Sequence, residues 1–582
     1  MRRYRCIPTL AVVALLATSC ERPAALPAPP VRKGFPIVFL LIDALRADRI
    51  DDEERLRHVA PSLAALSQDG VRFRSAFSSA PKTIPSVPQI FTSNLFPDLH
   101  HDVSLLSLLQ AAGYSRTGAF IHNPYVTKWL GRLSPTFEQL SGGDFDATRL
   151  TDDAIAWLGN AAADPFFLYV HYLDVHTPLN PPEDVARRFV DPDYKGPIGL
   201  SFNDMAGAWA GTYNAGDQRR IGQLYDASLA ATDASIGRLL GALRSAGLYD
   251  KALIIVTADH GEELWDHGGF FHGQSLYDEL LHVPLLVKFP GAWGGGRDVE
   301  TLVRSVDLLP TVVDLLQRAG SAAAGAPLDG ESLIPAVTGQ APPRTLFATV
   351  ARIDDRSPPL HAVRTASAKL IVDQRSGQEQ LFDLARDPGE RDNIAGHADA
   401  HPLLEDLRGR LARFLEPLQS SGIHVRLVNG TGARLTYRII LRSRPAGPFV
   451  NLSRVDMEDG DRIGQNAGAD GILMEGALAP GDEDEMRLDV LVPDGIVTTA
   501  IEVDPSGTPV ETCAGTEAAC VPVTSQRVAL EPARVTTNAT PARAADSSLQ
   551  VRVWRIPAAS TPILPNLSAA DRERLRALGY AE

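Results

Sequence analysis

The sequence predicts an α/β domain followed by a separate β-rich module. Continuous apolar runs of strand length recur from residue 36 onward, as in strands that are buried on both faces. A helical apolar stripe lies between them, most clearly over residues 221–243. After about Ser420 the pattern changes to short strand-like runs among Gly, Asp and Pro turns. A chain of 582 residues is long enough for both parts.

The first twenty residues predict an export signal. Basic residues precede an apolar run that is too short to span a bilayer comfortably, and small residues then lead to Cys20. This arrangement resembles a bacterial lipoprotein signal, with Cys20 as the lipidation site; an ordinary cleaved signal with an incidental cysteine is the alternative. Residues 21–34 are rich in Pro and Ala and predict a tether. We therefore expect an exported, membrane-anchored lipoprotein on the periplasmic or outer side of a bacterial cell.

Charge and cysteine content fit this location. The formal net charge of −15 argues against nucleic-acid binding. Cys513 and Cys520 flank a short turn-like loop and are expected to form a disulfide in an oxidising compartment, with two free thiols as the alternative. The oligomeric state does not follow from the sequence.

The predicted strands of the α/β domain end in chemistry-bearing residues. The buried strands are expected at residues 36–42, 166–170, 253–256 and 283–287. The first three are followed by acids or histidines, namely Asp43, Asp174 with His176, and Asp259 with His260. Ligands of open α/β sheets bind beyond the carboxyl ends of the strands, so these side chains are expected to meet in one crevice. This convergence predicts an enzyme.

The remaining elements complete the predicted organisation. Short strands are expected in the module at residues 425–428, 435–439 and 488–492, and a capped helix that stops near Gly579 is expected at the end. The predicted divisions are a signal peptide (1–20), a tether (21–34), a catalytic domain (35–420), a β-rich accessory module (421–566) and a C-terminal helix (567–582).

Several motifs occur in a fixed order along the catalytic part. They are DALRAD at residues 43–48, TIPS at 83–86, DVHTP at 174–178, ADHGE at 258–262, LYDE at 276–279 and FDLARDPGE at 382–390. Together they resemble the sulfatase family of the alkaline phosphatase superfamily. The resemblance covers residues 37–395. It implies an alkaline-phosphatase-like mixed, mostly parallel sheet between helices, with a small antiparallel subdomain before Ser420.

The resemblance also implies one divalent metal ion. Asp43, Asp259 and His260 fall on the family's metal motifs, and Thr83 is the expected fourth ligand. Carboxylates suit a hard divalent cation and imidazole can complete the set, but Ca, Mn, Mg and Zn are not distinguished. The alternatives are a capping carboxylate for Asp43 and a structural pair for Asp259 and His260.

Thr83 is the main departure from the family pattern. It stands where a sulfatase carries the Cys or Ser that becomes formylglycine, and threonine cannot give that aldehyde. A threonine hydroxyl can act directly as a nucleophile, as the resemblance implies for phosphodiesterases and lipoteichoic-acid synthases of the superfamily. A hydroxyl that only packs or caps a helix is the alternative.

Other positions depart from the pattern as well. Val87 stands where sulfatases place an arginine, and Ala44 replaces the second aspartate of many calcium sulfatases. A Lys-His segment of arylsulfatases is missing, and residues 121–124 (IHNP) stand near its place. Lys82 could offset the lost positive charge, although an ordinary surface lysine is the favoured interpretation.

Four further residues are candidates with open alternatives. His176 and His272 are expected to hold the ester oxygens or to protonate the leaving group, with satisfied structural histidines as the alternative. His267 is evenly balanced between a site and a structural role. Asp174 is expected either to orient His176 or to cap a turn.

The predicted function is metal-dependent hydrolysis of sulfate, phosphate or phosphonate esters, on small or polymer-linked substrates. Because Thr83 can attack phosphorus directly, phosphorus chemistry is favoured. Two alternatives stay open: a phosphoryl- or phosphoglycerol-type transferase of the same superfamily, and a catalytically dead binding protein. The β-rich module could also recognise a surface glycan.

Overall fold

A computed structural model describes most of the catalytic part and the strands of the C-terminal module. The described residues are 26–95, 103–121, 123, 126–127, 130, 146–161, 165–321, 328–350, 359–374, 376–419, 422–444, 449–457, 461–465, 471–490, 496–504, 510–515, 521–523, 527–530 and 549–556. Among these residues, no helix combines the length and apolar character needed to cross a membrane. The signal peptide with Cys20, Cys520 and the predicted C-terminal helix lie outside them.

A mixed sheet forms the centre of the catalytic part. In spatial order, its described strands are β10 (Arg297–Val299), β2 (Val71–Phe73), β9 (Leu285–Lys288), β6 (Leu253–Thr257), β1 (Ile37–Ile42), β5 (Phe166–Tyr172) and β4 (Arg116–Ile121). β1 pairs in parallel with β5 and β6, and β5 pairs in parallel with β4. The predicted mixed, mostly parallel sheet is therefore confirmed.

One predicted strand runs in the opposite direction. We expected residues 283–287 to form another buried strand of the parallel type, but β9 pairs antiparallel with both β6 and β2. Its apolar run is explained by burial alone, because all four residues of β9 are buried. Burial on both faces gives a continuous apolar run whichever way a strand points.

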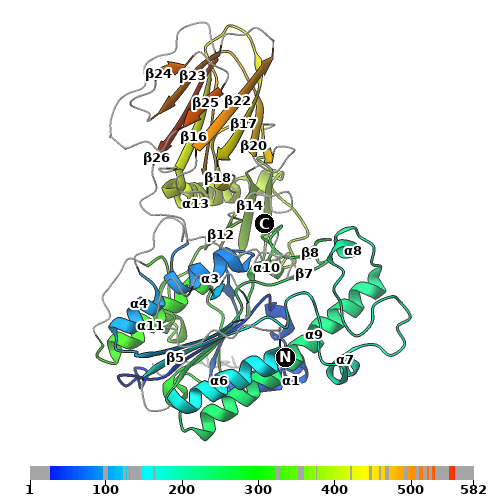
Figure 1. Cartoon of the computed structure of the whole chain (residues 1–582), viewed down its shortest axis with the longest axis vertical. Helices are drawn as coiled ribbons and strands as arrows, with labels where there is room; N and C mark the ends of the chain where they lie inside the picture. The colour runs from blue at the N-terminus through cyan, green and yellow to red at the C-terminus, as the bar shows by residue number, and fades with distance from the viewer. Residues whose placement is uncertain are drawn as a thin grey trace, which may run out of the picture.

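Helices cover both faces of this sheet (Figure 1). On one face lie α3 (Thr83–Thr92), α4 (Leu105–Ala111), α11 (Leu308–Arg318) and α12 (Ile334–Val337). On the other lie α1 (Glu53–Val59), α2 (Pro61–Asp69), α6 (Ala147–Ala161) and α9 (Ala215–Ser245). Beyond these, α7 (Glu183–Phe189) packs against α9, and α8 (Met205–Trp209) packs against the short strand β8 (Phe270–Phe271). The predicted helix over residues 221–243 is the middle of α9.

The central strands divide their side chains between two hydrophobic cores. Alternate residues of β1 face opposite sides, so Ile37, Phe39 and Leu41 enter one core and the residues between them enter the other. All six side chains of β1 are buried. A strand covered on both faces is held rigidly, so the residue that follows it has a well-defined position.

A small antiparallel subdomain follows the main sheet, as predicted. Its strands are β12 (Leu346–Thr349), β13 (Leu360–Arg364), β14 (Ala368–Asp373) and β15 (Glu379–Asp383), paired in chain order. The helix α13 (His401–Gln419) packs against β13 and β14 through an apolar stripe that includes Leu404, Leu407 and Leu411. Short elements complete this part: β3 (Ala76–Phe77), β7 (Glu263–Leu264), β8 (Phe270–Phe271), α10 (Asp278–Leu281) and β11 (Val303–Arg304).

The C-terminal region consists of two further sheets, which confirms the predicted β-rich module. One contains, in order, β18 (Phe449–Asp456), β21 (Glu483–Val490), β16 (Gly422–Asn429), β26 (Leu549–Ile556), β23 (Val510–Gly515) and β24 (Val521–Val523). The other contains β19 (Arg462–Gln465), β20 (Gly471–Leu478), β17 (Leu435–Arg444), β22 (Ile496–Asp504) and β25 (Arg527–Leu530). The module lies beyond α13, away from the main sheet (Figure 1). The disulfide between Cys513 and Cys520 and the exact domain boundaries stay predictions.

Candidate functional site

Three candidate metal ligands meet at the carboxyl ends of β1 and β6. Asp43 follows β1, and Asp259 and His260 follow β6. Each offers one ligand atom within 4.8 Å of the others, and all three are fully buried. Because β1 and β6 are adjacent and parallel, their ends place these residues side by side although more than two hundred positions separate them in the sequence.

The donor chemistry of this cluster fits a cation. His260 Nδ1 donates to the Gly261 carbonyl oxygen at 2.7 Å, so the Nε2 atom of the neutral ring carries a lone pair. That atom lies 3.5 Å from Asp43 Oδ1 and 3.4 Å from Asp259 Oδ2. Three acceptor atoms that face one another in a buried space repel each other unless a positive charge lies between them.

The two carboxyl groups respond differently to burial. Burial by itself would raise the pKa of Asp43, but the hydrogen bond from His171 is the first of the opposing effects that lower it to about 2. Burial raises the pKa of Asp259, and the negative charge of Asp43 raises it further. Asp43 is therefore ionised, and a second negative charge beside it is costly without a cation.

Thr83 is the first residue of α3 and points into the same cluster. Its Oγ1 atom lies 3.3 Å from Asp43 Oδ2 and 3.2 Å from His260 Nε2, and its side chain is fully buried. The N-terminal end of a helix carries partial positive charge, which favours negative charge on a group placed there. The structure thus brings together all four predicted metal-site residues, Asp43, Thr83, Asp259 and His260.

A strained turn after β1 holds Asp43 in place. Ala44 has a φ of 59°, in the left-handed region that costs energy for any residue with a Cβ atom. The Tyr225 hydroxyl of α9 donates to the Ala44 carbonyl oxygen at 2.6 Å and accepts from the Arg46 amide at 3.0 Å. The Ala44 amide donates to Asp259 Oδ1 at 3.3 Å. These contacts tie the turn to α9 and to the end of β6.

Two further predicted histidines border the cluster. The rings of His176 and His272 lie 4.9 Å apart, and the ring of His272 lies 4.2 Å from that of His260. His176 Nδ1 donates to the Thr177 carbonyl oxygen at 2.5 Å, and His272 Nδ1 lies 3.0 Å from Glu262 Oε1. Burial lowers the pKa of both histidines, and for His272 the neighbouring imidazoles and Lys82 add to the effect. Both rings are therefore neutral near pH 7.

Lys82 is not the ordinary surface lysine that its sequence context favoured. Its side chain is half-buried, and its methylene stem crosses so closely over Gly273 that a Cβ atom there would lie 1.9 Å from Lys82 Cε. Gly273 has a φ of 90°, which also favours glycine. The Lys82 charge acts on His272, so this lysine contributes positive charge at the border of the cluster.

Several predicted residues lie elsewhere or have other partners. Asp174 accepts a hydrogen bond from the Ala147 amide at the start of α6, so it caps that helix and does not hold His176. His267 Nδ1 lies 2.5 Å from Glu279 Oε1, and its Nε2 lies 3.0 Å from the Glu390 carbonyl oxygen, which is a structural role. Val87 lies within α3 and packs into the hydrophobic core.

Position 122 lies outside the described residues, as does position 124. Asn123 is buried, and its Oδ1 atom accepts from the Val126 amide. This contact is local to the segment.

The sequence interpretation missed one residue that contacts the cluster and one that contacts its border. His171, within β5, lies with its Nε2 atom 3.0 Å from Asp43 Oδ2. Glu262, beside His272, is fully buried, and burial raises its pKa well above the usual range. A lone histidine inside the apolar run of residues 166–172 was a visible signal, but only the strand pairing shows which residue it faces.

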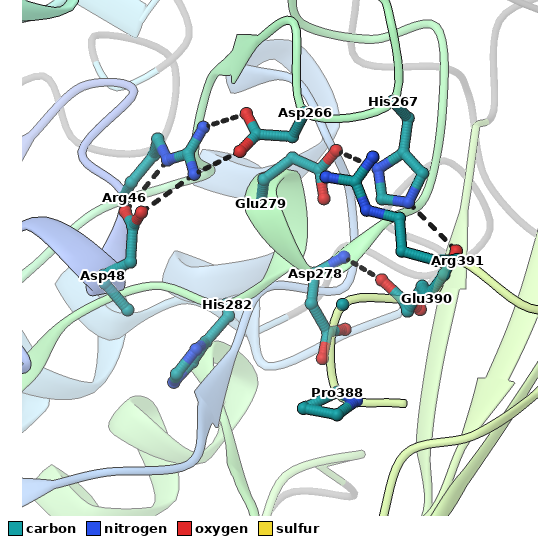
Figure 2. A pocket seen from close by; sticks show the side chains of 12 residues that line it. Arg46, Asp48, Asp266, His267, Asp278, Glu279, His282, Pro388, Glu390 and Arg391 are labelled. Carbon is teal, nitrogen blue, oxygen red and sulfur yellow. Dashed lines mark hydrogen bonds and ion pairs between the residues drawn. The ribbon is translucent and has the colours of Figure 1, made fainter. Parts of the chain in front are cut away.

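A charged cavity of about 210 Å³ is lined in part by Asp266 and His267, which belong to the loop that follows His260. Figure 2 shows that Arg46 binds both Asp48 and Asp266 there, while His267 binds Glu279. Arg46 Nη1 also donates to the Glu262 carbonyl oxygen at 3.1 Å. These contacts hold the loop between β6 and α10, which begins at the metal-site residues Asp259 and His260.

The fold and the buried cluster define an alkaline-phosphatase-like α/β protein with its site at the carboxyl ends of parallel strands. Residues 36–318 match the sulfatase family, and residues 266–416 match the family described as N-sulphoglucosamine sulphohydrolase, C-terminal. Over these residues the chain is similar to the sulfatase family.

Individual relatives show the same similarity. The chain is 33% identical over 205 residues to arylsulfatase K of Bos taurus, covering 32% of this chain and 35% of that protein. It thus spans about a third of the length of that curated relative. The phosphonate monoester hydrolase of Agrobacterium radiobacter has the same fold, with a TM-score of 0.52 and 21% identity over 66% of this chain and 95% of that one. A protein solved with D-glucosamine-2-N,6-O-disulfate gives a TM-score of 0.53 and 22% identity, covering 66% of this chain and 97% of that one.

Proposed function

We propose that this chain hydrolyses sulfate, phosphate or phosphonate esters, that phosphorus esters are its main substrates, and that Thr83 is the nucleophile. The observation that carries the proposal is the position of Thr83. Its Oγ1 atom lies at the N-terminus of α3, within 3.3 Å of both Asp43 Oδ2 and His260 Nε2. A hydroxyl placed among metal-suited donors is poised for nucleophilic attack.

Asp43, Asp259 and His260, with Thr83, would hold one divalent cation. Such a cation, when bound, would lower the pKa of the hydroxyl and neutralise charge on the ester oxygens. The three mutually facing acceptor atoms of Asp43, Asp259 and His260 support this assignment. His176 and His272 border the cluster, so their rings lie beside the oxygens of a bound ester.

The chain's own groups supply the other steps. Thr83 Oγ1 forms the bond to phosphorus or sulfur while the bond to the leaving alcohol oxygen breaks, and the threonine ester is then hydrolysed by water. The neutral ring of His272 or His176 takes up the proton that Thr83 Oγ1 releases and passes it to the leaving alcohol oxygen. Full burial of Thr83 excludes bulk water before the ester enters, which strengthens each polar contact in the site.

The preference for phosphorus rests on the residue at position 83. A formylglycine nucleophile requires Cys or Ser, and Thr83 has an additional methyl group. The relatives are named for both chemistries: arylsulfatase K on one side, and the Agrobacterium phosphonate monoester hydrolase on the other. The shared fold is compatible with either, so the nucleophile decides our preference.

The test is a panel of chromogenic sulfate, phosphomonoester, phosphodiester and phosphonate esters, assayed with Mn²⁺, Zn²⁺, Ca²⁺ and Mg²⁺. We expect the highest kcat/KM on a phosphorus ester and a phosphorylated Thr83 peptide in quenched reactions. Thr83→Ala should lose most turnover with a smaller change in KM, and Thr83→Ser should keep part of it. Turnover confined to sulfate esters, or undiminished turnover in Thr83→Ala, would contradict the proposal.

We also propose that a lipid on Cys20 anchors the mature chain to a bacterial membrane. The basic, apolar and small-residue segments that precede Cys20 support this. Cys20→Ser should abolish labelling by a fatty-acid probe and release the protein from the membrane fraction. A wild-type protein that is already unlabelled and recovered in the released fraction would rule out the anchor.

A further inference from the structure

A chain of two hydrogen bonds runs from the interior of β5 to the metal-site carboxylate. The parallel register of β1 and β5 sets Leu41 opposite His171, so Asp43 lies just beyond the histidine. His171 Nε2 is 3.0 Å from Asp43 Oδ2, and His171 Nδ1 is 3.0 Å from the Tyr169 hydroxyl. All three side chains are fully buried, so water does not compete for these contacts.

The direction of each hydrogen bond follows from the donor inventory. An ionised carboxylate can only accept, so His171 Nε2 carries the hydrogen and donates to Asp43 Oδ2. The Nδ1 atom of the neutral ring then accepts, and the Tyr169 hydroxyl is its donor. The ring is thus held in one tautomer and one orientation by a partner on the same strand.

The contact determines which way the Asp43 carboxylate faces. With Oδ2 held by His171, Oδ1 is directed to the side of His260, whose Nε2 atom lies 3.5 Å away. Thr83 Oγ1 lies within 3.5 Å of both oxygens of the same carboxylate. A rotation of the Asp43 carboxylate would therefore displace its metal-ligand oxygen and at the same time change its contact with Thr83.

We propose that His171, held by Tyr169, is a positioning residue that orients the Asp43 carboxylate toward the cation and Thr83. The inference rests on the proposed function, because it concerns the same site. Residues that hydrogen-bond to metal ligands commonly change metal affinity or activity by about 10- to 100-fold when removed. His171 itself neither contacts the ester nor reacts.

The test measures Mn²⁺ binding to metal-stripped protein by titration calorimetry, with the ester assay alongside. His171→Leu should weaken Mn²⁺ binding by about 10- to 100-fold. His171→Gln, which restores an N–H donor, should recover most of the affinity. Tyr169→Phe should give a smaller loss, because the imidazole stays but is less firmly oriented.

A matched control lies on the same strand. Tyr172 is fully buried on the opposite face of the sheet, where its hydroxyl lies 2.9 Å from Thr151 Oγ1. Tyr172→Phe also removes a buried hydroxyl from β5 but should leave Mn²⁺ affinity unchanged. If His171→Leu does not fold, Tyr169→Phe and His171→Gln compared with Tyr172→Phe decide the question.

The outcomes separate this inference from the function it deepens. Wild-type Mn²⁺ affinity in folded His171→Leu, or in Tyr169→Phe when His171→Leu does not fold, overturns the positioning role alone. The expected affinity pattern, in a wild-type protein that turns over no ester of the panel, overturns the proposed activity and leaves the positioning role standing. A wild-type protein that binds no divalent cation overturns both.

Discussion

Replacing Lys369 by methionine should lower the free energy of unfolding, because this lysine forms ion pairs between the antiparallel subdomain and α10 of the catalytic part. Lys369, on β14, is fully buried, and its Nζ atom lies 2.8 Å from Asp278 Oδ1 and 2.7 Å from Glu390 Oε1. Removing one partner of a buried ion pair commonly costs about 3–5 kcal/mol. Two features reduce the cost here: Asp278 keeps Arg364 at 3.0 Å, and Glu390 can take up a proton.

The expected cost is therefore about 3 kcal/mol, at the lower end of that range, and it should depend on pH. Burial raises the pKa of Glu390 to about 7 although Lys369 opposes the shift. Below this value the carboxyl is already neutral in the wild-type protein and loses little when the lysine is removed. Above it, the folded variant must either keep a buried charge without its partner or hold a proton that the unfolded chain has released. Lys369→Met should therefore cost more at pH 8 than at pH 6.

Urea unfolding, followed by circular dichroism at both pH values, measures this. The double variant Lys369→Met/Glu390→Gln is the control and should recover most of the stability lost at pH 8, because it removes the orphaned charge. A cost below about 1 kcal/mol, or an equal cost at the two pH values, would refute the electrostatic reasoning. The electrostatic reasoning would also be refuted if the double variant recovered stability only at pH 6 and not at pH 8.

Three further predictions concern the site and its scaffold. Asp259→Ala should abolish Mn²⁺ binding while the far-ultraviolet spectrum stays native, and full metal content by mass spectrometry would contradict the ligand role. Burial raises the pKa of Asp233 to about 6 from 3.8, so between these values the folded state holds a proton that the unfolded state has released. Stability should therefore fall by up to about 3 kcal/mol as pH rises from 4 to 6, and Asp233→Asn should remove this slope in urea titrations; an unchanged slope would exclude the group. Ala44→Gly should raise the free energy of unfolding by about 1 kcal/mol by relieving the left-handed φ, and a lower unfolding midpoint would show that the turn is not strained.

The centre of the site was predictable because its residues directly follow the predicted strands. Asp43 and the pair Asp259 and His260 each follow a buried apolar run, and the carboxyl ends of parallel strands share one edge of a sheet. The position of Thr83 followed from the motif around it. These residues are predictable because local sequence and strand direction together decide where they lie.

Other features depend on pairing that a single sequence does not contain. The orientation of β9 is antiparallel, yet its apolar run is the same as that of a parallel strand. His171 faces Asp43 only through the register of β1 and β5. Lys82 lies at the border of the site because Gly273, almost two hundred positions later, leaves room for its stem.

The complete burial of Thr83 bears on two properties that an activity assay usually measures together, the reaction type and the range of alcohols accepted. If Thr83 is the nucleophile, its complete burial requires the tetrahedral end of an ester to enter the site while a larger alcohol portion stays outside. In that outer region Phe271 lies against His272, and Trp209 of α8, a large apolar side chain that is 39% exposed, lies 6.1 Å beyond it. On the proposed function, discrimination among alcohols, measured as a ratio of kcat/KM values, would then depend on this aromatic surface. Reaction type and substrate range could accordingly diverge in evolution by independent substitutions.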